Sequence, residues 1–396
     1  MSAHLPANLS RLQRPALIAG LVALAVCVVG VLINPAQFFI AYLFAFLFWL
    51  GISLGAMAFS MVHWMVHGRW GLLIRRFQEA AAGVIPLMIL FFIPVALAVH
   101  VLYPWANEAR LAGDALLRHK APYLNLPFWL VRAAVYFCVW TVIALLLRRW
   151  SLRAEASDAP KDRLRVQRLC AVGILAYVFT MSYAAVDWNM SREPHYYSTV
   201  FGFIVVVGHA LEGLAFVVLV LTLVAKEAPY DRAIAPQALN DLGSLLFTLV
   251  ILFGYMEFAQ YLVNWAGNQQ NEIAWYVPRM AHAWGWLAVV LVVFHFFVPF
   301  FTLLSRRNKR SLRVMGGVAV LLLVMRLVDV FWMVAPSGTA AQPHVVGAVA
   351  VIFAFVAPIG IGGVWVAAFL WLLGRRPLLP AAALAVESAE GAKHAA

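Results

Sequence analysis

The sequence predicts an all-α integral membrane protein with ten transmembrane helices. Hydrophobic residues make up 64% of the 396 residues and charged residues only 12%, a composition whose apolar surface a soluble protein could not bury. Ten apolar segments have the length of about 20 residues that a bilayer requires. Lysine and arginine gather in alternate links between these segments, as they do in proteins that cross a membrane several times.

The ten apolar segments are separated by short polar links or by proline. Those near 80–104 and 278–304 contain internal prolines, which a packed membrane bundle tolerates because neighbouring helices satisfy the freed backbone groups. The predicted helices cover residues 15–34, 37–65, 80–104, 126–148, 168–188, 197–225, 238–265, 278–304, 312–335 and 345–374.

The positive residues predict the orientation of the chain. If the N-terminus is cytoplasmic, most of the 29 lysines and arginines fall in cytoplasmic links, including the dense run from Arg148 to Arg168. Positive residues favour the cytoplasmic side, so both termini are predicted to be cytoplasmic. The net charge of +12 is then a consequence of membrane topology, and we expect no nucleic-acid partner.

A weak internal repeat divides the chain. The segment Leu102–Ala106 resembles Leu262–Ala266, and Arg148-Arg149 recurs as Arg306-Arg307. The two copies start four helices apart, so both cross the membrane in the same direction. The sequence therefore predicts two parallel-repeat four-helix bundles, over 37–190 and 191–340, with one flanking helix on each side. Residues 1–36 would hold the N-terminal segment and the first flanking helix, and 341–396 the last flanking helix and a disordered C-terminal tail.

Two polar residues lie near the middle of the sixth apolar segment. His209 and Glu212 are three residues apart and therefore share one face of a helix. Two interpretations remain open for residues this deep in a membrane. They form a buried hydrogen-bonded pair that determines helix packing, or they act as a protonatable relay or a polar contact for a ligand.

The seventh segment carries two acids. Asp241 and Glu257 are sixteen residues apart, which places them about 160° apart around the helix, so they cannot line one stripe. Asp241 is either an acid favoured by the helix N-terminus or a proton entry point. Glu257 is either part of a relay or the partner of a structural contact.

Two further polar groups lie toward the outer side. Arg326 and Asp329 are three apart and predict an ion pair within one helix, with orientation of a quinone or closure of a proton path as the alternative. Asp187, with Arg192, Glu193 and His195 in the following link, forms either a solvated rim or a functional cluster.

The sequence argues against a cofactor held by this chain. His282 and His295 are thirteen apart, about 140° around one helix, whereas a helix that serves two stacked haems needs both histidines on one face. The three cysteines form no CxxC motif, and no zinc motif or nucleotide-binding loop is present. We therefore expect no metal and no redox centre in this chain.

The link after the fifth predicted helix resembles a segment of a known protein family. Residues Asp187–Gly202 read DWNMSREPHYYSTVFG, which resembles the hairpin of the ActF subunits of alternative complex III, relatives of the NrfD-like and polysulfide-reductase membrane subunits. The likeness extends to the ten helices and the paired four-helix bundles, and so covers nearly the whole chain. Arg192 stands where that group more often has an apolar residue.

The resemblance implies a subunit of a respiratory quinol:cytochrome c oxidoreductase in the bacterial inner (cytoplasmic) membrane. Its expected partners are a second NrfD-like membrane subunit, a multihaem cytochrome c and iron–sulfur subunits, so that c-type haems and iron–sulfur clusters belong to the partners. This chain would scaffold quinol oxidation and provide a proton pathway or a contact for quinone. Asp187 and His195 belong to the matched hairpin; the other candidates come from the residues themselves.

The candidates suggest one order for a proton path from cytoplasm to periplasm. Asp241 comes first, then His209 and Glu212, then Glu257, and finally Asp187 with Asp329. Two other functions fit the same residues. Parallel repeats, helix-interrupting prolines and buried charges also describe secondary transporters, and the chain could be a purely structural membrane anchor.

Overall fold

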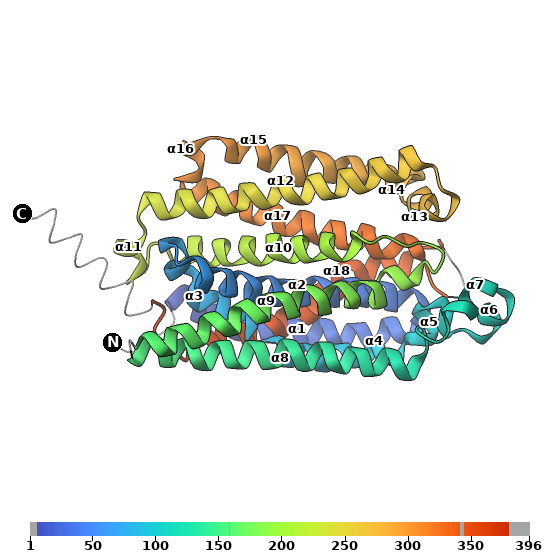
Figure 1. The fold of residues 1–396 in the computed structure, drawn as a ribbon, viewed down its shortest axis with the longest axis horizontal. Coiled ribbons are helices and arrows are strands. Elements are labelled where there is room, and N and C mark those ends of the chain that lie inside the picture. The colour runs from blue at the N-terminus through green and yellow to red at the C-terminus, as the bar shows by residue number, and fades with distance from the viewer. Residues whose placement is uncertain (1–5, 158, 341–343, 380–396) are drawn as a thin grey trace, which may run out of the picture.

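The computed structural model describes residues 6–157, 159–340 and 344–379. Long helices run side by side along the longest axis of the molecule (Figure 1), and the secondary-structure elements of the described residues are all helical. Ten helical spans among the described residues are long and apolar enough to cross a membrane. The predicted all-α architecture with ten spans is therefore confirmed.

The spans have the following bounds. They are α1 (Ala7–Ile33), α2 (Pro35–Val66), α3 with α4 (Arg69–Ala82 and Ile85–Leu97), α8 (Leu126–Ser157), α9 (Pro160–Trp188), α10 (Phe201–Val224), α12 (Pro236–Gly267), α14 with the π-helical turn η3 and α15 (His282–Leu291, Val292–Phe297 and Val298–Leu304), α17 (Leu312–Val334) and α18 (Ala348–Leu373). Short helices link them: α5 (Val99–Leu102), η1 (Pro104–Ala106), α6 (Glu108–Gly113), α7 (Ala115–Lys120), η2 (Met190–Arg192), α11 (Tyr230–Ala233), α13 (Gln270–Met280), α16 (Arg306–Lys309) and η4 (Ala335–Ser337).

Four predicted boundaries are wrong at the end of the molecule that carries most of the positive charge. The first span begins at Ala7 rather than residue 15, and the third begins at Arg69 rather than residue 80. Helices α8 and α9 extend through the basic run that was predicted as a link. Helix α3 remains helical because its charges are paired: Arg76 binds Glu79 at 2.9 Å, and Arg75 binds Glu155 of α8 at 3.0 Å. Hydropathy alone excludes such charged helical turns from a span.

The spans pack as two groups of four. In the first group α2 packs against α4 and α9, and α8 packs against both α4 and α9; in the second, α10 packs against α12 and α17, and α15 packs against both α12 and α17. The groups meet through α2 and α10, while α1 and α18 pair with each other against α2. The contacts follow the same order in both groups; the internal repeat itself remains a prediction, as do the domain boundaries.

Glycines bring α2 and α10 into close contact. A Cβ atom on Gly55 would lie 1.7 Å from the carbonyl oxygen of His209, and one on Gly213 would lie 2.5 Å from the amide nitrogen of Ala56. Membrane helices use small residues for such close approach, because packing rather than exclusion from water holds them together. This crossing places His209 and Glu212 directly against α2.

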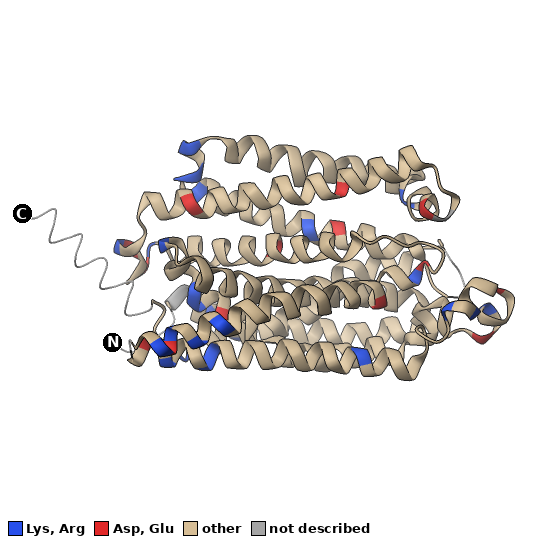
Figure 2. Ribbon diagram, viewed as in Figure 1, with Lys and Arg blue, Asp and Glu red and all other residues tan. Residues whose placement is uncertain are grey.

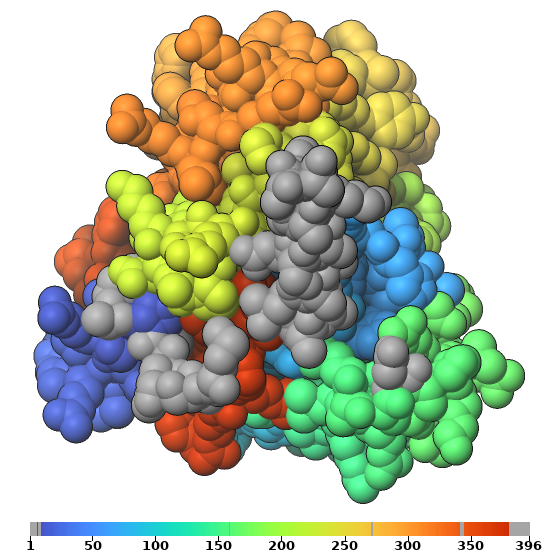
Figure 3. Space-filling model, turned by 90° about the vertical axis from the view of Figure 1, so that its left-hand side faces the viewer, coloured from blue at the N-terminus to red at the C-terminus, as the bar shows by residue number. Residues whose placement is uncertain are grey.

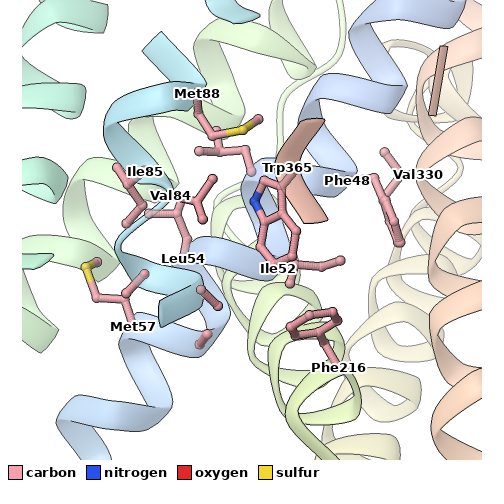
Figure 4. Close-up of a cluster of buried hydrophobic side chains, with 14 of the residues drawn as sticks. Phe48, Ile52, Leu54, Met57, Val84, Ile85, Met88, Phe216, Val330 and Trp365 are labelled. Carbon is pink, nitrogen blue, oxygen red and sulfur yellow. The ribbon is translucent and has the colours of Figure 1, made fainter. Parts of the chain in front are cut away.

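Apolar packing surrounds the crossing (Figure 4). The Trp365 ring of α18 packs edge-on against Phe216 of α10, with 5.1 Å between ring centroids, and its indole donates a hydrogen bond of 2.8 Å to Ser53 of α2. Phe48 and Ile52 extend the same buried cluster along α2. The Trp365 side chain thereby contacts both α2 and α10.

Lysine and arginine gather at one end of the bundle, where α11 and α16 lie (Figure 2). Helices α1 and α12 expose large apolar side chains such as Leu32 and Phe258, so the sides of the bundle are suited to a lipid bilayer. The cytoplasmic location of both termini remains a prediction. The predicted disordered tail lies almost wholly in 380–396, outside the described residues.

Candidate functional site

A buried arginine joins two carboxyl groups in the second group of helices. Arg326 of α17 forms an ion pair with Asp329 one turn along the same helix, which confirms the predicted pair. Its Nε atom also lies 3.5 Å from Oε2 of Glu212 on α10. The three side chains are almost completely buried. The contact with Glu212 was not predicted, because the two residues are far apart in the sequence.

Two glycines make room for this cluster. A Cβ atom on Gly208 would lie 2.6 Å from Nη2 of Arg326, and one on Gly51 would lie 1.7 Å from Oε1 of Glu212. Any larger residue at either position would displace a charged group. The absence of side chains at these positions on α2 and α10 thus determines where the guanidinium and the carboxyl group meet.

His209 lies on the same face as Glu212, as predicted, but contacts another helix. Its Nδ1 atom is 3.3 Å from the hydroxyl of Tyr177 on α9. Both oxygens of Glu212 lack a hydrogen-bond partner among the described residues, so of the two interpretations left open, the hydrogen-bonded pair of His209 and Glu212 is wrong. The reason is geometric: Arg326 attracts the carboxyl group toward α17, while the imidazole turns toward α9. No feature of the sequence indicated Tyr177.

The charges of this cluster do not balance. Arg326 carries one positive charge and can neutralise one of the two carboxylates beside it. A second uncompensated carboxylate in a membrane interior is costly, so that carboxyl group requires a proton or another cation. The cluster therefore holds one carboxyl group more than Arg326 can neutralise, and Glu212, which has no hydrogen bond, is its least satisfied member.

A small cavity connects the cluster with Glu257. Glu257 of α12 and Asp329 both line it, together with Gln260, Tyr196 and Trp275. The space open to the centre of a water-sized sphere is about 20 Å³, enough for one water molecule with polar partners. Glu257 and Asp329 thus line one space that is large enough for a water molecule to bridge them.

The outer wall of this cavity is aromatic and polar. The rings of Tyr196 and Trp275 stack with centroids 4.8 Å apart. Gln260 accepts a hydrogen bond of 3.0 Å from Ser198, in the hairpin before α10. Burial raises the pKa of Tyr196 to about 12, so its hydroxyl is neutral at physiological pH. Tyr196, Trp275 and Gln260 therefore give the cavity a neutral lining beside its two carboxyl groups.

The span formed by α14, η3 and α15 places a histidine, His295, near the cluster. The sequence suggested this histidine only as a haem ligand. His295 lies in the π-helical turn η3 and is buried. Phe253 of α12 lies between it and the cluster, with its ring centroid 5.0 Å from that of His295 and 5.0 Å from the Arg326 guanidinium carbon. Such π-helical turns occur frequently at functional sites.

Asp187 belongs to a separate, fully paired group. Arg132 of α8 donates hydrogen bonds of 2.7 and 2.8 Å to its two carboxylate oxygens, and Tyr136 donates a third of 2.8 Å. The solvated rim considered for Asp187 is therefore wrong, because the acid lies at the end of α9 facing α8. A carboxylate with a bidentate arginine and a tyrosine is a structural ion pair.

The other residues of the predicted outer cluster lie apart. Arg192 is buried and donates to the carbonyl oxygens of Val334 and Gly338, so it caps the end of α17. His195 is exposed and lies 2.7 Å from Asp114. Desolvation alone would raise the pKa of Asp114, but hydrogen bonds from His195 and from two backbone amides lower it below its ordinary value.

The predicted order of the proton path needs one correction. Asp329 contacts Arg326, beside Glu212, and is not grouped with Asp187. Asp241 lies at the basic end of the molecule, where the order begins; it accepts a hydrogen bond of 3.0 Å from Gln237 one turn earlier and does not line the cavity with Glu257. The structure thus brings together His209, Glu212, Glu257, Arg326 and Asp329 and leaves Asp187, His195 and Asp241 outside.

Among the described residues, no group of three or more histidine, cysteine, aspartate or glutamate side chains could hold a metal ion. In comparisons with known proteins, no protein-family model and no curated protein matches the chain.

Proposed function

We propose that this chain is a membrane subunit of a respiratory quinol:cytochrome c oxidoreductase of the alternative complex III type, and that its buried carboxyl cluster holds and passes a proton. The observation that carries the proton role is the position of Arg326 between Glu212 and Asp329, with one positive charge for two buried carboxyl groups. The assignment to this class of complex rests on the resemblance of the hairpin at 187–202.

The hairpin residues support a role in assembly rather than in chemistry. Trp129 donates a hydrogen bond of 3.1 Å to the carbonyl of Asp187, and Tyr103 donates one of 2.9 Å to that of Trp188. Trp105 donates to the hydroxyl of Ser191 at 3.1 Å. These contacts hold the outer end of the first helix group rigid, where a peripheral partner subunit would rest. A scaffold for cytochrome c and iron–sulfur subunits needs such a fixed platform.

The size of the cavity separates the proton role from a quinone role. Sites for organic ligands have volumes of about 300–1,000 Å³, whereas the space beside Glu257 is about 20 Å³. This cavity accommodates water but not a quinone ring. We therefore assign the proton role to this cavity, and place the quinol site, as the resemblance implies, in the second NrfD-like subunit or at its interface with this chain.

Gentle purification from the native bacterial inner membrane tests the proposed function. A tag on this chain should recover a complex with a second multi-spanning subunit, and the visible spectrum should show c-type haem that is reduced by quinol. A colourless chain that purifies alone and moves a solute in vesicles would show it to be a secondary transporter instead. A coloured complex whose turnover is unaffected by loss of any buried carboxyl group would leave this chain a structural anchor.

A further inference from the structure

A basic groove between α8 and α9 has no part in the proposed function. Its volume is about 870 Å³, and it lies at the end of the molecule where most lysines and arginines gather (Figure 2). Helices α8 and α9 are the green helices at the lower right of Figure 3. Four cations and one carboxylate line the groove: Arg153, Lys161, Arg165, Arg168 and Asp162.

Helical spacing directs these cations to one place. Lys161, Arg165 and Arg168 follow one another at intervals of four and three residues on α9, so they share a face. Trp150 of α8 lies opposite, with its ring centroid 5.2 Å from the Arg165 guanidinium carbon. The sole acid of the lining, Asp162, already accepts a hydrogen bond of 2.6 Å from Ser157. The groove therefore presents an excess of unneutralised positive charge.

An apolar stripe continues from the groove along α9. Val172 lines the groove, and Leu175 and Phe179 follow it at intervals of three and four residues. Their exposed fractions are 69%, 61% and 64%, so the stripe lies on the outside of the bundle, where a bilayer would contact it. A ligand that matches both parts has an anionic head and long apolar chains. Free phosphate or a nucleotide would use only the basic part.

We propose that this groove binds the headgroup of an anionic phospholipid, with its phosphate oxygens paired to Arg153, Lys161, Arg165 and Arg168 and its acyl chains lying on the Val172–Phe179 stripe. Basic pockets between membrane helices on the cytoplasmic side are suited to such headgroups, and guanidinium groups bind phosphate in bidentate geometry. A zwitterionic headgroup would place its own ammonium against four cations and is disfavoured. This inference does not depend on the proposed respiratory function.

Native mass spectrometry of the full chain, with the subunits that co-purify, tests the lipid site. Delipidated protein is titrated with phosphatidylcholine, phosphatidylglycerol or cardiolipin, and we expect preferential binding of the two anionic lipids. The double variant Arg165→Gln/Arg168→Gln should bind them about 10-fold more weakly or worse, because each lost cation removes its attraction to the phosphate. The matched control is Arg306→Gln/Arg307→Gln, which removes equal charge at the same end outside the groove.

A charge-retaining variant and a competition with inorganic phosphate complete the test. Arg165→Lys/Arg168→Lys retains the charge and should keep most of the binding, which separates loss of charge from misfolding. Inorganic phosphate at millimolar concentration should not displace the lipid. Equal losses in the Arg165/Arg168 and Arg306/Arg307 glutamine variants, no preference for anionic lipid over phosphatidylcholine, or phosphate binding as tight as lipid binding would each overturn the proposal.

Discussion

At the scale of single residues, Arg132 and Arg326 differ in the number of carboxyl groups that each contacts. Arg132 meets one carboxylate, Asp187, with two hydrogen bonds and a tyrosine in support. Arg326 lies between two carboxyl groups, and Glu212 receives no hydrogen bond. A fully paired buried ion is stable and inert, whereas an excess acid is available to bind and release a proton. This contrast distinguishes the structural pair from the candidate site.

Removal of one partner of the structural pair should be costly. Arg132→Gln leaves Asp187 buried without its guanidinium, so the folded protein should lose about 3–5 kcal/mol of stability. The double variant Arg132→Gln/Asp187→Asn should recover part of this loss, since amides can hydrogen-bond to each other without charge. Thermal unfolding in detergent measures both. A single variant as stable as the wild type would show that Asp187 is not held by Arg132.

At the scale of helices, close approach decides which residues meet. Spacing within one helix is readable from the sequence, which is why the Arg326–Asp329 pair and the shared face of His209 and Glu212 could be predicted. The partner of Glu212 could not, because it depends on how α10 and α17 pack. Gly51 and Gly208, whose positions leave space for these charges, have no signature that distinguishes them from the other glycines.

A pair of glycine substitutions tests this role of close approach. Gly213→Ala places a methyl group 2.5 Å from the Ala56 amide nitrogen, which would push α10 away from α2 and lower the yield of folded protein. Gly317→Ala on α17 has nothing within 4 Å and should be neutral, or more stable by about 0.5–1 kcal/mol. Fluorescence-detected size-exclusion chromatography compares the two. Equal tolerance of both changes would contradict the close packing of α2 and α10.

At the scale of the whole molecule, composition predicts the number of spans but not their full extent. The ten spans follow from hydropathy, and the internal prolines did not disrupt that prediction. The charged turn of α3 and the basic ends of α8 and α9 were missed, because paired and snorkelling charges permit helix where hydropathy ends. The isolation of Asp187 from Asp329 is also a property of the whole fold: the two acids belong to different groups of helices.

The central claim is the proposal that Glu212, Asp329 and Glu257 hold and pass a proton. In the purified complex, Glu212→Gln keeps the shape of the side chain but cannot ionise, so we expect quinol:cytochrome c turnover to fall about 10-fold or more, with normal subunit composition and unchanged KM. Glu212→Asp should retain part of the activity, and Glu108→Gln, the same exchange on exposed α6, should retain all of it. Wild-type turnover in the Glu212→Gln complex would contradict the claim.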